Sequence, residues 1–288
     1  RIALMSDSVS GVSDRETAHA KINLALHVRK RLPDGYHQIE TIFAFLDQGD
    51  VIAAEPGEGI GLRISGPFAD GLSATDNLVL QAANRLAETS KVKIGAQLHL
   101  EKRLPVASGI GGGSADAAAT LRLLNRFWRL NHSISALAEI ARPLGADVPA
   151  CVTSQTCRGT GIGQDLTRIP DDGLRDCVAL LINPLVPVST AKIFAAWDGV
   201  DRGALQEGRV MAAAQSGRND LQKPAVALAP ILTDVLDLLE QCQPRLARMS
   251  GSGATCFALF DSRVEAENAE RHCRSAFGEI WTMIGRFR

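Results

Sequence analysis

Apolar and polar side chains alternate along the chain from Ala20 to Val28, the clearest periodicity near its start. Alternate positions of a strand point to opposite faces, so the apolar residues share one face while Lys21 and Asn23 share the other. We predict a half-buried strand with these two polar side chains on its open face. The Pro33-Asp34-Gly35 turn follows, and residues 38–46 are predicted to return as the second strand of a hairpin.

Shorter apolar patterns continue to the end of the chain, and they predict both strands and helices. One helix follows the glycine-rich stretch near residue 110, where Ala117, Leu121, Leu124 and Trp128 fall on one face. Helices and strands interleave but hairpins occur among them, which favours an α+β protein over a doubly wound parallel sheet. Strands are predicted at 51–54, 62–64, 94–100, 177–182, 255–260 and 280–284, and further helices at 76–88, 135–142, 191–197, 230–240 and 263–276.

The composition limits the kinds of partner. The 288 residues are 45% hydrophobic, which is enough chain for one large or two medium domains with proper cores. A net charge of −1 argues against a dedicated binder of nucleic acids or membrane surfaces, and no apolar run approaches the roughly 20 residues that span a bilayer. The six cysteines form no C-x-x-C pair, so we expect reduced thiols in a cytoplasmic protein. Residues 1–17 are expected to be a disordered N-terminal extension.

The stretch from Val106 to Asp116 carries four glycines in five positions. The N–H groups of such a loop can turn toward one point, because no side chains obstruct them. Ser114 is the expected N-cap of the helix that follows. A glycine loop that opens onto a helix N-terminus is an anion site, and phosphate is its usual occupant. A flexible surface turn is the alternative interpretation, and the loop fits neither the Walker A nor the dinucleotide-binding pattern.

Two charged residues are candidates for the chemistry. Asp147 stands in a turn between Gly145 and Pro149, and phosphoryl transfer to an alcohol commonly uses an aspartate that accepts the hydroxyl proton. An aspartate in a tight turn is also a common cap or Asx-turn residue. Lys21 is either a solvated strand lysine or a neighbour of Asp147, where it could hold the carboxylate ionised or polarise the attacking hydroxyl. Sequence spacing leaves these alternatives open.

Four motifs occur in the order in which the GHMP kinase superfamily carries them, and the chain resembles that superfamily. The motifs are Ala20–Leu24, Pro105–Ala115, Leu144–Pro149 and Met249–Ala254. The hairpin tip Pro33–His37 narrows the resemblance to the members that phosphorylate a cytidyl substrate. The match covers most of the chain.

The resemblance implies a fold and an activity. It predicts a two-domain α+β GHMP kinase, with an N-terminal ATP-binding domain at 18–170 similar to ribosomal protein S5 domain 2. A ferredoxin-like C-terminal domain is predicted at 171–288, with the active site in the cleft between the two. The implied activity is ATP-dependent phosphorylation of the substrate's 2-hydroxyl in the non-mevalonate isoprenoid precursor pathway. Mg²⁺ is expected with ATP, Ser114 is a candidate on the metal side, and a monomer or weak homodimer is expected.

The resemblance also assigns roles to residues. The catalytic pair falls on Lys21 and Asp147. Cytosine recognition falls on Tyr36, His37 and Phe194, with Asn23 and Thr190 nearby; the aromatic rings could sandwich the base while His37 reads its polar edge. A hairpin-tip tyrosine and a core phenylalanine are the alternative interpretations. ATP-binding positions fall on Asn77, Lys102, Pro105, Val106, Ala107, Ser108, Gly109, Ile110, Gly111, Gly112, Gly113, Ser114 and Ala115.

One departure and two rival functions accompany these assignments. The superfamily's loop often begins with three glycines where this chain has Ala107-Ser108-Gly109, so the first half of the loop is bulkier here. One rival is another GHMP kinase that acts on mevalonate, homoserine or a sugar, against which the Tyr36-His37 pair speaks. The other is a catalytically silent nucleotide-binding protein on the same fold, which the replacement of Lys21 or Asp147 would favour.

Overall fold

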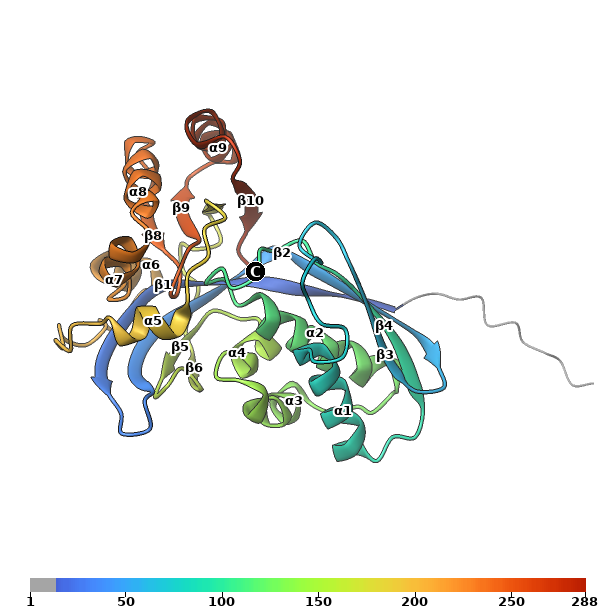
Figure 1. Ribbon diagram of the computed structural model, residues 1–288. Coiled ribbons are helices and arrows are strands. Elements are labelled where there is room, and N and C mark those ends of the chain that lie inside the picture. The colour runs from blue at the N-terminus through green and yellow to red at the C-terminus, as the bar shows by residue number, and fades with distance from the viewer. Residues whose placement is uncertain (1–13) are drawn as a thin grey trace, which may run out of the picture.

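A computed structural model describes residues 14–288 (Figure 1). Its longest feature is a hairpin of two strands, β1 (Asp14–Arg31) and β2 (His37–Gly57), which pair antiparallel from Asp14 and Ala54 to Arg31 and His37. The predicted strands at 20–28, 38–46 and 51–54 all fall within this hairpin. Residues 1–13 lie outside the described residues, and the expectation of disorder is wrong for residues 14–17, which begin β1.

The first sheet is built on the hairpin. One edge of β2 pairs with β1, and its other edge pairs with β4 at one end and β5 at the other. The remaining strands extend the sheet outward on both sides, in the order β3-β4-β2-β5-β6. The bounds are β3 (Ile60–Ser65), β4 (Gly95–Glu101), β5 (Cys157–Thr160) and β6 (Asp165–Arg168).

Four helices cover one face of this sheet (Figure 1). The apolar face predicted for the helix after the glycine loop is confirmed, because Ala117, Leu121, Leu124 and Trp128 are all buried in the core beneath the sheet. The helices are α1 (Leu78–Ser90), α2 (Gly112–Phe127), α3 (Ile134–Ala141) and α4 (Val148–Thr153), with a single 3-10 turn, η1 (Arg142–Leu144), between the last two.

The second sheet has the ferredoxin-like order. Strands β7 (Val178–Asn183), β8 (Leu246–Met249), β9 (Cys256–Phe260) and β10 (Trp281–Arg286) lie in the order β10-β7-β9-β8, and all pairs are antiparallel. The chain passes β7-α8-β8-β9-α9-β10, the βαββαβ path of that fold. Helices α8 (Ile231–Gln241) and α9 (Arg263–Phe277) pack on this sheet, and the shorter α5 (Thr190–Ala195), α6 (Val210–Ser216) and α7 (Gln222–Leu228) lie before α8 in the chain.

A separate apolar core fills the space between the two sheets. Ile22 and Leu24 from β1 pack there with Leu181 and Phe257 from the second sheet. The opposite face of β1 is covered as well, so the predicted open face is a wrong expectation: Lys21 is 3% exposed and Asn23 is 2% exposed. The strand alternates as predicted, but the glycine loop and the helical layer cover its polar side.

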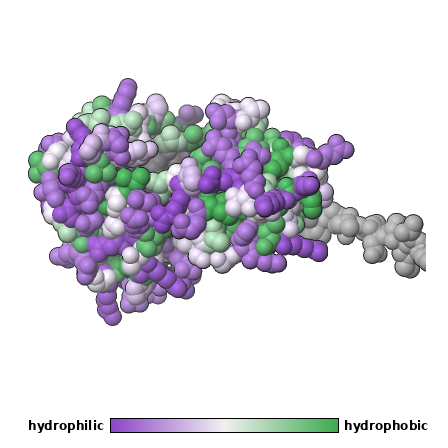
Figure 2. Space-filling model, turned by 90° about the horizontal axis from the view of Figure 1, so that it is seen from below, coloured by the Kyte–Doolittle hydropathy of each residue, from purple (hydrophilic) through white to green (hydrophobic). Residues whose placement is uncertain are grey.

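The outer surface mixes hydrophilic and hydrophobic side chains. Seen from below, hydrophilic side chains surround separate hydrophobic patches (Figure 2). Large exposed apolar side chains such as Ile94, Leu185 and Val264 come from distant parts of the chain. None of the helices within residues 14–288 combines the length and apolar character needed to cross a bilayer. The division into domains at residue 170 stays a prediction.

Candidate active site

The glycine loop is tied to both halves of the molecule. The N–H of Lys21 on β1 donates to the carbonyl of Ile110 (3.1 Å), and the N–H of Thr255 before β9 donates to the carbonyl of Ser108 (3.1 Å). The Ser250 hydroxyl donates to the carbonyl of Gly109 (2.8 Å). A Cβ on Gly109 would lie 2.3 Å from the Ser250 carbonyl oxygen, so only glycine fits this close approach. The flexible-turn alternative is wrong for this loop.

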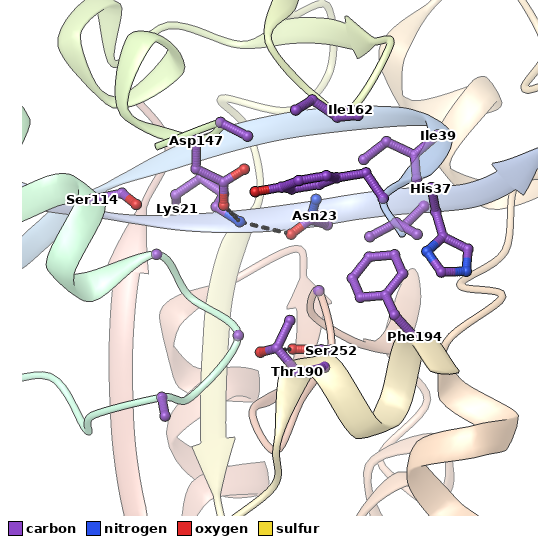
Figure 3. Close-up of a pocket in the computed structure, with 18 of the residues that line it drawn as sticks. Lys21, Asn23, His37, Ile39, Ser114, Asp147, Ile162, Thr190, Phe194 and Ser252 are labelled. Atoms are coloured by element: carbon purple, nitrogen blue, oxygen red, sulfur yellow. Dashed lines mark hydrogen bonds and ion pairs between the residues drawn. The ribbon is translucent and has the colours of Figure 1, made fainter. Parts of the chain in front are cut away.

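The entry to α2 differs from the expectation. The N-cap is Gly111, with a left-handed φ of 68°, and Ser114 lies inside the first turn, so the predicted cap is wrong. A Cβ on Gly111 would lie 2.9 Å from the Lys21 Cε, which explains why a glycine stands where the loop crosses β1. The Ser114 side chain is left on the cavity wall instead (Figure 3).

The bulkier first half of the loop still forms part of the cavity wall, because both Ala107 and Ser108 line the cavity. Ser108 is 4% exposed, and its hydroxyl donates to the carbonyl of Pro105 at 2.6 Å. Ala107 adopts a φ of 51°, in the left-handed region where a Cβ costs about 1–2 kcal/mol. The chain thus keeps the backbone shape that glycines would adopt, with local strain at Ala107.

Lys21 and Asp147 meet, as the catalytic interpretation requires (Figure 3). The Lys21 ammonium lies 3.0 Å from Asp147 Oδ2, and it donates to Asn23 Oδ1 at 2.9 Å. It also lies 5.1 Å from the centroid of the Phe43 ring. Asp147 stands at the N-cap of α4, yet its side chain makes no capping hydrogen bond within the described residues, which contradicts the cap alternative. Its side chain is 35% exposed toward the cavity, so a substrate hydroxyl can reach it.

Asn23 is held in turn by Thr41 on β2 and by Ser250 in the turn after β8. Its side-chain amide donates to the Thr41 hydroxyl at 2.8 Å, and its backbone N–H donates to Ser250 Oγ at 3.1 Å. Because the amide group is engaged by Thr41, the Asn23 carbonyl oxygen is fixed toward Lys21. The lysine is therefore held by a short chain of hydrogen bonds rather than by its ion pair alone.

An aromatic pocket closes the other end of the cavity (Figure 3). The His37 ring, 6% exposed, lies 5.1 Å from the Phe194 ring and 5.8 Å from the Trp197 ring between centroids. The Arg31 Nε donates to His37 Nε2 at 3.3 Å. Burial and the nearby Arg31 charge lower the pKa of His37, so the ring is neutral at pH 7. Since Nε2 accepts a hydrogen bond, the proton of the neutral ring lies on Nδ1.

One cavity of about 1010 Å³ is lined by the glycine loop, by Lys21, Asn23 and Asp147, and by His37 and Phe194. That volume is at the upper end of the range for a single drug-sized ligand. Near the aromatic end, Thr190 and Ser252 join across the cavity wall through their hydroxyls at 2.8 Å. The predicted residues that line the cavity are Lys21, Asn23, Tyr36, His37, Ala107, Ser108, Gly109, Gly111, Gly112, Gly113, Ser114, Asp147, Thr190 and Phe194.

Other predicted ATP-binding residues lie off the cavity wall for identifiable reasons. Ile110 and Ala115 are fully buried and pack into the cores, so their side chains support the loop. Asn77 caps α1 by accepting from the Val79 N–H, while its neighbour Leu78 lines the cavity. Pro105 and Val106 precede the part of the loop that faces the cavity.

Lys102 requires a correction. The sequence placed it on the wall of the adenosine site, but its side chain is 3% exposed and lies beneath the loop. Its ammonium pairs with Asp50 and, at 2.7 Å, with Asp116 Oδ2 on the first turns of α2. Asp50 Oδ1 also accepts from the N–H of Leu104 at 2.8 Å. Hydrogen bonds among these three side chains fasten the segment that enters the glycine loop to the helix that leaves it.

This buried triad, Asp50–Lys102–Asp116, contains two acidic side chains and only one basic side chain. Burial opposes the charge of Lys102, but the two carboxylates outweigh it and raise its pKa. Burial also raises the pKa of Asp116 to about 8, against the attraction of Lys102 and with the repulsion of Asp50. Within the described residues, Asp116 Oδ1 has no hydrogen-bond partner. A carboxyl that keeps its proton near neutral pH fits these surroundings best.

Sequence reasoning missed several residues of the cavity. Arg31 and Ile162 line it, and so does Ser252 from the Ser250–Gly253 turn. Ser252 lies in the Met249–Ala254 motif, so that signal was available. Arg31 precedes the hairpin turn and belongs to no recognisable motif. Only the pairing of the two strands places it beside His37.

Comparison with known proteins agrees with the architecture. Residues 77–155 match the pattern of the GHMP kinases N terminal domain, and residues 202–279 match that of the GHMP kinases C terminal. A relative from Rhizorhabdus wittichii, a 4-diphosphocytidyl-2-C-methyl-D-erythritol kinase, is 51% identical over 278 residues, covering 95% of this chain and 94% of that protein. The chain belongs to this family of GHMP kinases. The predicted superfamily is confirmed, and the chain is a small-molecule kinase.

Further members of the family and proteins of the same fold agree with this family assignment. A kinase of the same name from Sphingopyxis alaskensis is 49% identical over 95% of this chain and 98% of its own length. The crystal structure of a 4-(cytidine 5'-diphospho)-2C-methyl-D-erythritol kinase superposes with a TM-score of 0.75 at 31% identity, covering 94% of this chain and 99% of that one. A homoserine kinase from Cytophaga hutchinsonii reaches 0.74 at 16% identity, which reflects the shared fold alone. The predicted two-domain α+β fold is confirmed.

Ala107→Gly tests the strain in the loop. Glycine relieves the left-handed penalty of about 1–2 kcal/mol but adds about 0.4–1 kcal/mol of unfolded-state entropy, so we expect equal or slightly higher stability in urea unfolding. The KM for ATP should stay within about twofold. Ala118→Gly, within α2 and fully buried, is the matched control and should cost about 1 kcal/mol or more. Equal losses of unfolding free energy for the two variants would show that the backbone at Ala107 is not strained.

Asp116→Asn tests the buried triad. Because the pKa of Asp116 is raised, the folded state holds a proton that the unfolded chain has released, so wild-type stability falls as pH rises from about 4 to about 8. Asparagine mimics the protonated acid and removes this dependence. We therefore expect the melting temperature of the variant to gain on that of the wild type between pH 5 and pH 8. The exposed Asp70→Asn variant should show no such trend, and a constant difference for Asp116→Asn would refute the assignment.

Proposed function

We propose that the chain transfers the γ-phosphoryl group of ATP to the 2-hydroxyl of 4-diphosphocytidyl-2-C-methyl-D-erythritol, in the non-mevalonate pathway to isoprenoid precursors. One observation carries the assignment of roles within the cavity. The glycine loop lies at one end, an aromatic pocket with a neutral histidine lies at the other, and the Lys21–Asp147 pair lies between them (Figure 3). The site therefore has separate places for a phosphate donor and a nucleobase-bearing acceptor.

The donor end suits a triphosphate. The glycine loop faces the cavity directly before α2, so its free N–H groups and the positive end of the 16-residue helix favour negative charge there. We assign the β- and γ-phosphates to this position. The loop is held by β1 and by the Ser250–Thr255 turn, so its donors are oriented before the nucleotide binds.

Asp147 is the group that we assign to accept the proton of the 2-hydroxyl. Its Oδ2 faces Lys21, and its side chain is open to the cavity. Lys21 forms an ion pair with this carboxylate, and its ammonium can also stabilise the negative charge that spreads over the transferred phosphoryl group. The alcohol oxygen then attacks the γ-phosphorus, the bond from that phosphorus to the β-γ bridging oxygen breaks, and ADP leaves.

The acceptor end suits cytosine. Phe194 and the hairpin-tip Tyr36 both line the pocket, where their rings can stack on a base. The Nδ1–H of His37 is a donor, which matches the acceptor atoms of the cytosine edge. Uracil presents an N–H at the position where cytosine has an acceptor nitrogen, so a fixed donor at that position discriminates between the two bases. Asn23 and Thr190 line the cavity and are assigned to the substrate's polar atoms.

Mg²⁺ is proposed to accompany ATP. Within residues 14–288, no group of three or more His, Cys, Asp or Glu side chains could hold a metal ion. Mg²⁺ needs no such group, because it usually takes one or two protein oxygens together with phosphates and water. The Ser114 hydroxyl and the Asp147 carboxylate are oxygen donors on the wall beside the loop, so the residues fit. When bound, the ion would neutralise phosphate charge.

The rival functions fit the cavity less well. Mevalonate, homoserine and sugars have no nucleobase for the aromatic pocket, and a silent nucleotide-binding protein would not need the Lys21–Asp147 pair. We propose ATP and the cytidyl substrate as the partners, without nucleic acid or membrane, in the cytoplasm and as a monomer or weak homodimer. The near-neutral net charge and the six free cysteine thiols support this view.

Asp147→Asn tests the base. The amide keeps the shape but cannot accept the proton, so we expect kcat to fall by about 10²–10⁴-fold in a coupled ADP assay. The KM for both substrates should change little, and the melting temperature should stay near that of the wild type because the side chain is partly exposed. Survival of kcat within a few-fold in a folded variant would show that Asp147 is not the base.

Phe194→Ala tests the acceptor pocket. Loss of one stacking surface, worth about 1–3 kcal/mol per base, should raise the KM for the cytidyl substrate by about 5- to 150-fold and leave the KM for ATP unchanged. Phe277→Ala, at the end of α9, is the control and should change neither KM. Removal of the cytosine from the substrate should cause a similar loss in the wild type but a smaller one in Phe194→Ala. If cytosine removal caused the same loss in the wild type and in Phe194→Ala, Phe194 would not contact the base.

A further inference from the structure

A second cavity of about 230 Å³ lies outside the active site. Three segments converge on it: the end of α4 with the residues that follow, the chain that leaves β6, and Arg288 after β10. Its walls are mainly polar. None of the residues that line it also lines the active-site cavity. The residues are Thr153, Ser154, Gln155, Thr156, Arg168, Ile169, Pro170, Asp171, Arg175 and Arg288.

The cavity carries an excess of positive charge. Three arginines and one aspartate are the charged side chains that line it, so its wall carries two more positive than negative side chains. Asp171 is already paired with Arg175. Among residues 14–288, the guanidinium groups of Arg168 and Arg288 have neither an ion-pair nor a hydrogen-bond partner. Burial and the neighbouring Arg122 charge lower the pKa of Arg288 and outweigh the opposing attraction of Glu16, so a further anion would favour its cation.

Backbone pairing fixes the positions from which these exposed arginine side chains extend. The N–H of Arg288 donates to the carbonyl of Phe45 on β2 at 3.1 Å. Arg168 is the last residue of β6 and pairs with Cys157 on β5. The Thr156 side chain, 5% exposed, faces this space, and its hydroxyl has no partner within the described part of the chain. A free hydroxyl beside unpaired guanidinium forks is a donor set for tetrahedral oxyanions.

We propose that this cavity binds a phosphate or diphosphate group of a small molecule, separately from the ATP and the cytidyl substrate of the active site. Arg168 and Arg288 supply bidentate donors and Thr156 a hydroxyl. A volume of about 230 Å³ lies below the range of cavities that hold a whole drug-sized ligand, so the charged group enters and the rest of the molecule extends outward. The bound anion joins the end of α4, the chain after β6 and the end of β10.

Calorimetric titration with inorganic pyrophosphate tests this site, with the active site filled by a non-hydrolysable ATP analogue and the cytidyl substrate. We expect a binding event to remain in the wild type and to weaken at least tenfold in the Arg168→Gln/Arg288→Gln variant. Arg63→Gln, an exposed arginine on β3, is the matched control and should bind as the wild type does. Bound pyrophosphate should also raise the melting temperature of the wild type and of the control, but not of the double variant.

Two further arms sharpen the test. Thr156→Val removes only the hydroxyl, and it should weaken pyrophosphate binding severalfold even if the double variant folds poorly. Inorganic phosphate should bind the same site, whereas citrate should bind at least tenfold more weakly. The proposal is overturned if no binding event remains once the active site is filled, if both the double variant and Thr156→Val bind as tightly as the wild type, or if citrate binds as well as pyrophosphate. Each of these outcomes leaves the kinase assignment untouched.

Discussion

The close approach of the glycine loop to the Ser250–Thr255 turn is the constraint on which the site depends. Gly109 lies so near the Ser250 carbonyl that no other residue fits, and hydrogen bonds fix the loop to the turn on one side and to β1 on the other. The loop comes from the first half of the chain and the turn from the second. The phosphate-facing backbone is therefore shaped by both halves, and neither half alone would hold it.

Charge is distributed in two layers around this contact. On the cavity side, Lys21 faces Asp147, which is open to a substrate. Beneath the loop, Lys102 is enclosed by Asp50 and Asp116 and faces no ligand. The two lysines have different tasks because burial separates them: one ammonium can act on a reacting group, while the other holds the entrance of the loop to α2. Removal of either would disturb the loop, but in the proposed mechanism only Lys21 takes part in the reaction.

Local periodicity predicted what depends on neighbours in the sequence, such as β1 and the apolar face of α2. It could not predict that the polar face of β1 is covered, because that cover comes from residues about ninety positions away. Lys102 was misplaced for the same reason: its partner Asp50 is 52 positions earlier in the chain. The short elements α4, β5 and β6 were missed because four to six residues carry too little periodicity. Asp147 was found through its motif, and its meeting with Lys21 required the fold.

The hairpin of β1 and β2 has a consequence for the size of molecule that the enzyme accepts. Lys21 lies in the middle of the hairpin, and His37 starts its second strand beside Arg31. Since both are fixed in one paired ladder, the hairpin would set the distance between the reacting alcohol and the nucleobase in the proposed reaction. An alcohol linked to its base by a much shorter tether cannot reach both ends at once. A single residue inserted into β1 between them would turn Lys21 or Arg31 to the opposite face of the sheet.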